Sequence, residues 1–334
     1  MSDAVQAPWI ERQVGQLLQQ RGHAWLLQGP SGLGHYALAL ALARAWLCEQ
    51  AGPHGACGYC ASCHAIDVHA HADLLVLMPE TLMLELGWPL SSEAQDKIDK
   101  KERKPSKEIR VDALRDAVEF SQRTDARGRG KVVLVYPAER MNAIAANALL
   151  KTLEEPPGNM RFVLACENAQ VLLPTIRSRC LSHTLQWPQE GEALSWLQAQ
   201  DLPADEAARL LSLMGQRPED ALDEARQGRS SAWWMALPKA LLQGQIQHLA
   251  DLSPSQQVQA LMKVAHDLVL VQSGATPRYF STEALPATQA SLRSLGDWYK
   301  RLQQSLRTAE HPFNAGLMLE ALVSDAQQTL SSKA

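Results

Sequence analysis

The sequence predicts an α/β fold with a parallel sheet, followed by a second half built of helices. Short apolar runs of strand length alternate with helical segments through the first 185 residues, an order typical of parallel sheets covered by helices on both faces. Beyond that point the strand-like runs end, and segments rich in Leu, Ala and Gln continue to the C-terminus. Four prolines separate these later segments: Pro188, Pro203, Pro218 and Pro254.

Four short apolar runs are the predicted strands of the sheet. They span residues 23–30, 73–79, 131–137 and 161–168. Helices are expected where apolar residues recur at helical spacing, or where helix formers continue without a breaker. In the first half these helices cover residues 9–20, 36–49, 109–124 and 142–157. The polar segment 81–108 is expected to be irregular.

The bulk composition is that of a globular protein. The chain has 334 residues, of which 46% are hydrophobic and 20% charged, enough for two or three domains. The sequence shows neither an apolar run of about 18 residues nor a secretory leader, so a cytoplasmic protein is expected. The net charge of −4 argues against a chain that coats nucleic acid by charge alone.

A glycine-rich loop, GPSGLGHY, follows the first predicted strand and precedes a helix. Gly29, Gly32 and Gly34 reproduce the frame of the phosphate-binding pattern G-x-x-x-x-G-K-[ST]. His35 stands where the pattern has the lysine that neutralises the β- and γ-phosphates, and Tyr36 stands where it has the Mg²⁺-binding hydroxyl. The loop therefore predicts a phosphate-binding frame that has lost its catalytic side chains. Taken alone, the motif also fits a glycine turn in an unrelated fold.

A second catalytic element is missing at the end of the strand predicted over residues 131–137. Active P-loop enzymes need an acidic pair there, one member to hold Mg²⁺ and the other to orient the attacking water. This chain has Tyr136 and Pro137 instead, and the nearest carboxylate is Glu139. The chain is therefore not expected to hydrolyse ATP, and the sequence leaves open whether the loop still binds a nucleotide. An active ATPase with reassigned catalytic residues is the alternative.

Four of the six cysteines are clustered. Cys48, Cys57, Cys60 and Cys63 have the spacing C-x8-C-x2-C-x2-C around a glycine-rich loop. In a cytosolic chain such clustering favours a metal over disulfides, and four thiolates without an open position describe a structural zinc site. An iron–sulfur cluster and free thiols are the alternatives. The other two cysteines are expected to be buried apolar residues.

Further segments resemble a known family. NALLKTLEEPP (147–157), the strand after it and TIRSRC (175–180) resemble the bacterial clamp-loader branch of AAA+ proteins. The degenerate glycine loop and the four cysteines are similar to those of a non-catalytic subunit in that branch. The resemblance is dense over residues 21–185. It thins in the helical half, where GQRPEDAL (215–222) and PFNAGLMLEALV (312–323) are similar to family segments.

The resemblance implies three domains. Residues 1–185 would form an AAA+-type P-loop domain with an inserted zinc module at 48–63, residues 186–228 a small helical lid, and residues 229–334 an all-α collar for oligomerisation. The whole would be a non-catalytic stator subunit of the DNA polymerase III clamp loader, which loads the sliding clamp onto primed DNA during replication. The implied partners are the gamma/tau motor subunits and the delta subunit, with the clamp and primer-template DNA reached through the complex. Zinc is the implied cofactor.

The family also suggests a role for one arginine. Ser178, Arg179 and Cys180 match its Ser-Arg-Cys motif, whose arginine resembles an arginine finger inserted into the ATP site of an adjacent subunit. The resemblance implies that Arg179, with Ser178, acts in trans on the γ-phosphate of a neighbour's ATP. The alternative is that Arg177 and Arg179 are surface arginines that follow a strand.

Two weaker signals are left open. The basic stretch 97–110 is interleaved with acidic residues, so a solvated face is the preferred interpretation and phosphate contact the alternative. Arg217 stands where AAA+ lids often place a nucleotide-sensing arginine, with a structural role as the alternative. A zinc-stabilised DNA-binding protein is a third hypothesis for the whole chain, and the net charge argues against it.

Overall fold

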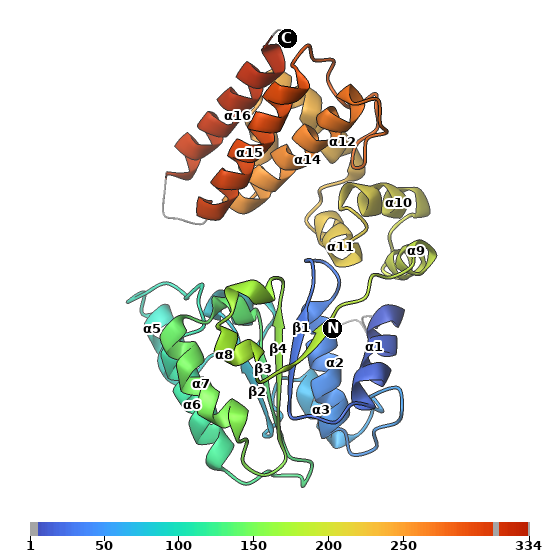
Figure 1. Cartoon of the computed structure of the whole chain (residues 1–334). Coiled ribbons are helices and arrows are strands. Elements are labelled where there is room, and N and C mark those ends of the chain that lie inside the picture. Colours follow the sequence, from blue (N-terminus) through green and yellow to red (C-terminus); the bar gives the residue numbers. More distant parts are fainter. Residues whose placement is uncertain (1–5, 310–313, 333–334) are drawn as a thin grey trace. The chain divides into compact units, whose positions relative to one another are not determined.

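The computed structural model describes residues 6–309 and 314–332. The first two residues of segment 312–323, and the outermost ends of the first and last predicted domains, lie outside the described residues. The chain divides into two compact units, Met1–Glu192 and Ala193–Ala334 (Figure 1). The first unit contains a sheet, and the second is helical over its described residues. The predicted change of architecture along the chain is therefore confirmed.

The first unit is built on a five-stranded sheet whose neighbouring strands are all parallel. The strand order is β2-β3-β4-β1-β5. The strands are β1 (Ala24–Gln28), β2 (Leu74–Leu77), β3 (Lys131–Val135), β4 (Met160–Cys166) and β5 (Leu181–Thr184). The first four correspond to the four predicted runs. β5 was not predicted, because its sequence LSHT has no apolar run, and it forms a strand by pairing with β1 at the edge of the sheet.

Eight helices accompany the sheet in the described part of this unit. They are α1 (Pro8–Leu18), α2 (His35–Leu47), α3 (Ala61–Asp67), α4 (Glu80–Glu85), α5 (Ser92–Asp99), α6 (Val111–Gln122), α7 (Ala143–Glu154) and α8 (Pro174–Arg177), with short 3-10 helices η1 (Ala138–Arg140) and η2 (Ala169–Val171). The prediction of irregular structure over 81–108 is wrong, because α4 and α5 lie there. α5 buries none of its residues, and its apolar residues are the half-buried Ala94 and Ile98, four positions apart. Its start is fixed by Ser91, whose hydroxyl accepts the backbone N–H of Ala94 at 3.3 Å.

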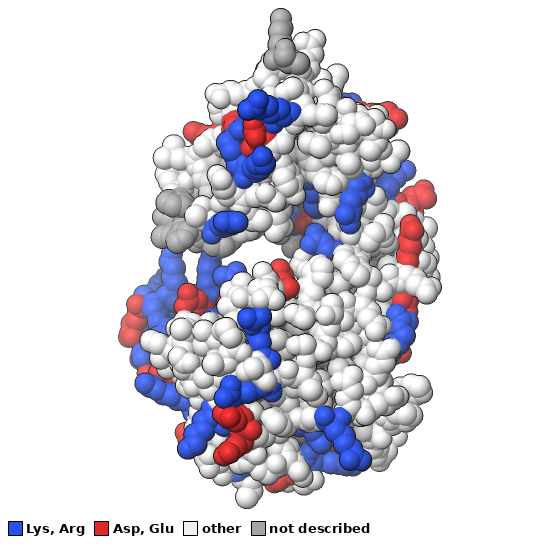
Figure 2. Space-filling view, in the orientation of Figure 1, with Lys and Arg blue, Asp and Glu red and all other residues white. Residues whose placement is uncertain are grey.

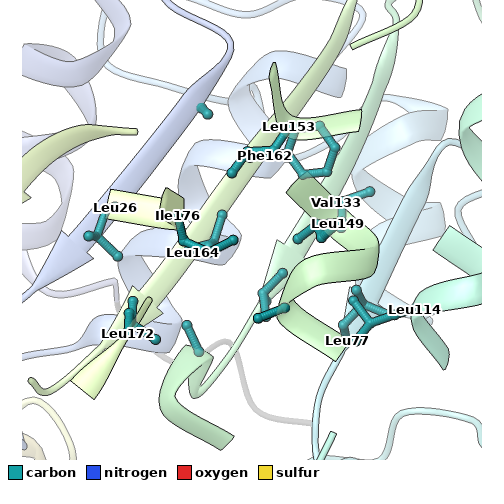
Figure 3. Packing of buried hydrophobic residues seen from close by; sticks show 14 of the residues in the cluster. Leu26, Leu77, Leu114, Val133, Leu149, Leu153, Phe162, Leu164, Leu172 and Ile176 are labelled. Carbon is teal, nitrogen blue, oxygen red and sulfur yellow. The ribbon is translucent and has the colours of Figure 1, made fainter. Parts of the chain in front are cut away.

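The core explains why the other strands were predictable. On one face Val133 and Phe162 pack against Leu149 and Leu153 of α7, and Leu26 lies on the side of Ile176 in α8 (Figure 3). The opposite face is covered by α2, which contacts β1, β3 and β4. Because alternate side chains of a strand point to opposite faces, strands covered on both faces appear in the sequence as continuous apolar runs.

The second unit begins within α9 (Glu190–Gln198) and consists of helices over its described residues. They continue with α10 (Ala204–Leu213), α11 (Pro218–Arg226), α12 (Ser231–Leu242), α13 (Gln247–Ala250), α14 (Pro254–Gln272), α15 (Leu292–Thr308) and α16 (Ala315–Ser331). Two of the separating prolines open helices α11 and α14, where the missing proline N–H costs nothing. α14 packs against both α15 and α16. The division into a lid over 186–228 and a collar over 229–334 stays a prediction.

Among the described helices, none combines the length and the apolar composition that crossing a membrane requires.

Candidate functional site

The glycine loop joins the carboxyl end of β1 to the start of α2. Gly32 and Gly34 have φ angles of 73° and 96°, in the left-handed region where glycine is strongly favoured. Trp9 of α1 fixes the loop, because its indole N–H donates to the carbonyl of buried Leu33 at 3.0 Å. The frame predicted from the sequence is therefore present between a strand and a helix, where backbone N–H groups are available to a phosphate.

His35 is buried within this frame. Its side chain is 3% exposed, and its Nε2 lies 2.9 Å from the carbonyl oxygen of Gly29. Because that oxygen is an acceptor, Nε2 carries the proton. Burial lowers the pKa of His35, and the hydrogen bond to Gly29 opposes that shift. A neutral imidazole therefore bonds back to the loop at the position where the phosphate-binding pattern requires a charged lysine.

Aromatic side chains stand at the two positions where the P-loop pattern expects Mg²⁺-binding groups, Tyr36 and Tyr136, and they contact each other. Tyr36 stacks on Tyr136, with 5.7 Å between ring centroids. Trp88, from the segment between α4 and α5, donates its indole N–H to the Tyr36 hydroxyl at 2.6 Å and stacks on His69 at 4.0 Å. Burial raises the pKa of the Tyr36 phenol, although the bond from Trp88 opposes that shift. Sequence reasoning missed Trp88 and His69, because no spacing rule links them to the glycine loop.

Glu139 is the carboxylate nearest in sequence to Tyr136 and Pro137, and the turn after β4 holds it in place. It lies in η1, and its Oε1 accepts the backbone N–H of Glu167 at 2.9 Å. Its Oε2 is buried and has no hydrogen-bond partner among the described residues. The carboxylate thus contributes a structural bond at the end of the sheet.

Arg179 lies at the opposite end of the sheet from the glycine loop. The β1–β5 register pairs Trp25 with Leu181 and Gln28 with Thr184, so the loop follows β1 at the level where β5 ends. Arg179 comes two residues before β5 begins. The three steps from Leu181 to Thr184 span about 10 Å at about 3.3 Å per residue, and the backbone of Arg179 lies before the first of them, on the side away from the chain's own glycine loop.

Three acceptors hold the Arg179 guanidinium. Nη1 donates to the carbonyl of Thr175 at 3.0 Å and to Oγ of Ser178 at 3.4 Å. Nη2 donates to Oε2 of Glu154, the last residue of α7, at 3.0 Å. The side chains of Arg179 and Glu154 are 30% and 56% exposed. The structure thus brings together the two predicted residues, Ser178 and Arg179, and adds a carboxylate that sequence reasoning did not assign to the site.

The four clustered cysteines converge on one point. Their sulfur atoms all lie within 4.8 Å of one another, with 3.8 Å between Cys48 and Cys60 and 4.0 Å between Cys57 and Cys63. Four sulfurs bound tetrahedrally to one zinc at about 2.3 Å would lie about 3.8 Å apart. The sulfur positions therefore fit a single tetrahedral ion.

Backbone N–H groups point at two of these sulfurs. Cys57 and Gln50 donate to Sγ of Cys48 at 3.2 and 3.4 Å, and Cys63 donates to Sγ of Cys60 at 3.4 Å. Burial raises the pKa of the Cys60 thiol, but backbone N–H groups, first that of Cys63, outweigh it and bring the pKa down to about 6. Burial outweighs the donors at Cys48, whose pKa is raised, and it raises the pKa of Cys63 to about 12. The donors thus favour the thiolate, the form that binds a metal, most clearly at Cys60.

The cysteine loop is tied to the segment that precedes β3. Nη1 of Arg127 donates to the Glu49 carboxylate at 2.7 Å, and Arg129 donates to the Glu49 carbonyl. Ser62, beside one of the cysteines, donates its hydroxyl to the same carboxylate at 3.2 Å. Both arginines therefore have partners within the chain. Their bonds to Glu49 connect the four-cysteine cluster to the segment that leads into the sheet.

Two cations of the basic stretch 97–110 have acidic partners. Nη2 of Arg103 donates to Glu80 at 2.7 Å, and Lys97 pairs with Glu93 at 2.6 Å. On the face displayed in Figure 2, positive and negative side chains are interspersed. These pairings support the interpretation of the stretch as a solvated face.

Arg217 and the two remaining cysteines have structural contacts. Arg217 precedes α11, donates to the carbonyl of Met214 at 2.8 Å and pairs with Asp220 at 2.9 Å. Cys166 is buried and Cys180 half-buried against the core of the first unit. Burial raises the pKa of each thiol to about 12. The prediction that these two cysteines are packing residues is confirmed.

The parallel sheet and the glycine loop after β1 define an α/β protein whose loop has the glycine spacing of the phosphate-binding pattern. The sequence model of the family described as "DNA polymerase III, delta subunit" matches residues 10–189. That match covers more than half of the chain, and the chain belongs to this family.

Individual relatives agree with this assignment. The chain is 40% identical over 215 residues to the DNA polymerase III subunit delta' of Pseudomonas aeruginosa, covering 63% of this chain and 58% of the relative. It is 37% identical over 195 residues to the delta' subunit of Escherichia coli, covering 57% and 52%. The matched region thus spans little more than half the length of these curated relatives. The resemblance found in the sequence, to the bacterial clamp-loader proteins, is confirmed, and these relatives are delta' subunits.

A solved structure shows the same fold over a longer stretch. The "gamma subunit-related protein" of DNA polymerase III from Thermotoga maritima superposes with a TM-score of 0.51 and 19% identity, covering 96% of this chain and 99% of that one. At this identity the likeness concerns the fold alone.

Proposed function

We propose that this chain is the non-catalytic stator subunit of a DNA polymerase III clamp loader and supplies Arg179 to the ATP site of a neighbouring motor subunit. The observation that carries the proposal is the placement of Arg179 at the amino edge of the sheet. A side chain there is a strand's length from the chain's own glycine loop. It is therefore available to a nucleotide held by another chain.

The chemistry of the glycine loop supports the first half of this proposal. A triphosphate at this loop would meet the neutral His35 in place of a lysine, and the Tyr36–Tyr136 stack in place of the Mg²⁺ ligands. Hydrolysis depends on charge neutralisation at the phosphates and on an oriented water. An active ATPase with reassigned residues would need new groups for both tasks, and Glu139 is already bonded to the backbone of Glu167.

The chemistry of arginine supports the second half. Negative charge on the γ-phosphate oxygens must be stabilised in the transition state, and a permanently charged planar guanidinium inserted from outside does this. The Thr175 carbonyl and the Ser178 hydroxyl hold Nη1 of Arg179, which orders the side chain before a partner arrives. Ordering in advance reduces the entropy lost on engagement.

We further propose zinc as the structural cofactor of the loop between α2 and α3. Cys48, Cys57, Cys60 and Cys63 would hold it, and a closed four-sulfur set leaves no position for a substrate. The metal would supply folding energy to a loop that is short of apolar residues. A zinc-stabilised DNA-binding protein is less well supported. The arginines that contact the cysteine loop, Arg127 and Arg129, would be its candidates for binding phosphate, and both already bond to Glu49 within the chain.

The partners follow from the same proposal. They are the gamma/tau motor subunits and the delta subunit, and the sliding clamp and primer-template DNA would be contacted through the assembled complex. The helical second unit would hold the chain in the ring.

The test is the ATPase rate of a complex reconstituted with this full-length chain, clamp and primed DNA. In the Arg179→Ala complex we expect hydrolysis at the site that receives the finger to fall roughly a thousandfold. Arg179→Lys should fail as well, because lysine lacks the planar fork. Arg177→Ala is the matched control, since Arg177 is held by Gln170 at 2.7 Å.

Two results would contradict the proposal. An unchanged stimulated rate with Arg179→Ala, or a loss found only with Arg177→Ala, would remove Arg179 from the role. ATP hydrolysis by the isolated chain would favour the active-ATPase alternative.

A further inference from the structure

We infer that Glu154 is the counter-ion that holds Arg179 on its own chain and from which Arg179 is transferred to the γ-phosphate of the neighbour's ATP. This inference rests on the proposed function of Arg179. Glu154 ends α7, and its Oε2 lies 3.0 Å from Nη2 of Arg179. Glu155, the next residue, forms no ion pair with any cation among the residues that the structure describes.

The hydrogen bonds that Arg179 donates show why it must release Glu154 before it binds a γ-phosphate. A guanidinium has five N–H donors. Both donors of Nη1 are directed to Thr175 and Ser178, and one donor of Nη2 is directed to Glu154. Nε is buried and has no partner within the described ranges 6–309 and 314–332. Two donors are therefore unpaired, Nε and one of Nη2, but Nε is buried in this arrangement. An exposed pair of donors for a phosphate becomes available when Glu154 releases Nη2.

Glu154 is the acceptor best able to leave. Thr175 contributes a backbone carbonyl in α8, which also accepts the Ser178 hydroxyl at 3.1 Å, so that acceptor is fixed by the helix. The Glu154 side chain is 56% exposed and sits at the end of its helix. Ion pairs with this much exposure are weak, and a γ-phosphate with its greater negative charge is a stronger partner for the guanidinium.

Charge gives a second reason for exchange. A carboxylate that stayed 3.0 Å from the guanidinium would offset the positive charge that Arg179 delivers to the transition state. It would also repel the γ-phosphate oxygens at close range. Glu154 therefore orders Arg179 in the free subunit and must be displaced when Arg179 engages the nucleotide.

The experiment compares Glu154→Gln with Glu155→Gln in the reconstituted complex. Both variants remove one carboxylate and keep the side-chain length, but only the first removes a partner of Arg179. We measure kcat and KM for ATP in the presence of clamp and primed DNA. Glu154→Gln should lower KM by about two- to fivefold, the range expected for loss of an exposed pair, without lowering kcat. Glu155→Gln should match the wild type.

Two controls test the route of the effect. The KM difference between wild type and Glu154→Gln should shrink at high salt, because salt screens an exposed pair. In an Arg179→Ala background, Glu154→Gln should have no effect, since the partner through which it acts is gone.

Each other outcome overturns the inference. Equal KM values for Glu154→Gln and Glu155→Gln would show that the pair does not restrain Arg179. A lower kcat with Glu154→Gln would mean that the carboxylate stays bound and supports the finger. If Glu154→Gln still changed KM in the Arg179→Ala background, the effect of Glu154 would not act through Arg179. Failure of the proposed function is a separate result, namely an Arg179→Ala complex with an unchanged rate.

Discussion

The side chains that replace the catalytic residues of the glycine loop have contacts of their own. His35 bonds to the Gly29 carbonyl, and Tyr36 stacks on Tyr136 and accepts from Trp88. These contacts tie the loop to the segment between α4 and α5. Restoring a lysine at position 35 alone would remove a buried contact and still leave no carboxylate at position 136.

Lys263 in the second unit is a half-buried lysine that is not among the candidate site residues. Its Nζ lies 3.2 Å from Sδ of Met214 and 4.6 Å from the ring centroid of Trp234. Burial lowers its pKa to about 8, with repulsion from Arg217 in the same direction and attraction to Asp220 and Glu224 opposing. The folded state therefore disfavours the charged form of this lysine.

We predict that this lysine makes stability depend on pH. Its folded pKa of about 8 lies below the ordinary value of 10.5, so between these two values the unfolded chain binds more protons than the folded one. Stability then rises with pH across that window, and below it the full cost of burying the charge is present. Lys263→Met, which removes the titration, should be about 1 to 3 kcal/mol more stable than wild type near pH 7. This advantage should fade as pH approaches the upper value.

Urea unfolding at several pH values between 7 and 10.5 measures this difference. The control is Lys239→Met on α12, because Lys239 is exposed and its replacement should leave the pH profile unchanged. Parallel profiles for Lys263→Met and wild type would contradict the prediction.

At the scale of elements, the cysteine loop connects α2, α3 and the segment before β3. Glu49 follows the first cysteine directly and accepts hydrogen bonds from Ser62, Arg127 and Arg129. If the sulfurs are not held together, Glu49 loses its fixed position. The arginine segment before β3 then loses its anchor.

We predict that removing the metal loosens this segment as well as the loop. Purified protein should contain about one zinc per chain. Chelation, or Cys57→Ser, should lower Tm by roughly 10 °C, as expected for a loss of about 3 kcal/mol in a domain of this size. Trypsin should then cut faster after Arg127 and Arg129. Metal analysis, thermal unfolding and mapped proteolysis give the three readouts.

His64→Ala is the matched control for this experiment. His64 flanks the cluster but is exposed, and the four sulfurs already complete a tetrahedral set. Its replacement should leave the zinc content and Tm unchanged. Iron in place of zinc, or full stability after chelation, would contradict the prediction.

The elements that were predictable differ from the missed ones in how they are stabilised. β1, β3 and β4 carry their own signal, because burial on both faces demands apolar residues throughout. α5 buries nothing, and β5 exposes Leu181, Ser182 and Thr184 at the edge of the sheet. Their stability comes from a cap, ion pairs and a neighbouring strand, which leave little trace in the pattern of hydrophobic residues.

At the scale of the whole molecule, we predict that the isolated chain does not respond to Mg²⁺-ATP. A site with a Kd a hundredfold below the ligand concentration would add about 2.7 kcal/mol to stability and raise Tm by several degrees. We expect no shift at millimolar ATP, because His35 occupies the lysine position and aromatic rings occupy the metal positions. Thermal unfolding with and without Mg²⁺-ATP measures this change in Tm, and a gamma/tau subunit serves as the positive control. A clear upward shift would show that the frame still binds nucleotide.

The sequence by itself determined the parallel α/β architecture of the first half, the glycine frame with its missing lysine and acidic pair, the four-cysteine set and the clamp-loader resemblance. These features depend on residue types at fixed spacing along the chain, because a buried strand, a phosphate-binding turn and a metal loop are local in sequence. Only the tertiary structure decided which distant side chains meet. Trp88 reaches Tyr36, the arginines before β3 reach Glu49, and Glu154 reaches Arg179. Such contacts depend on strand order and helix packing, since a single sequence does not state which of many exposed carboxylates will lie beside a given arginine.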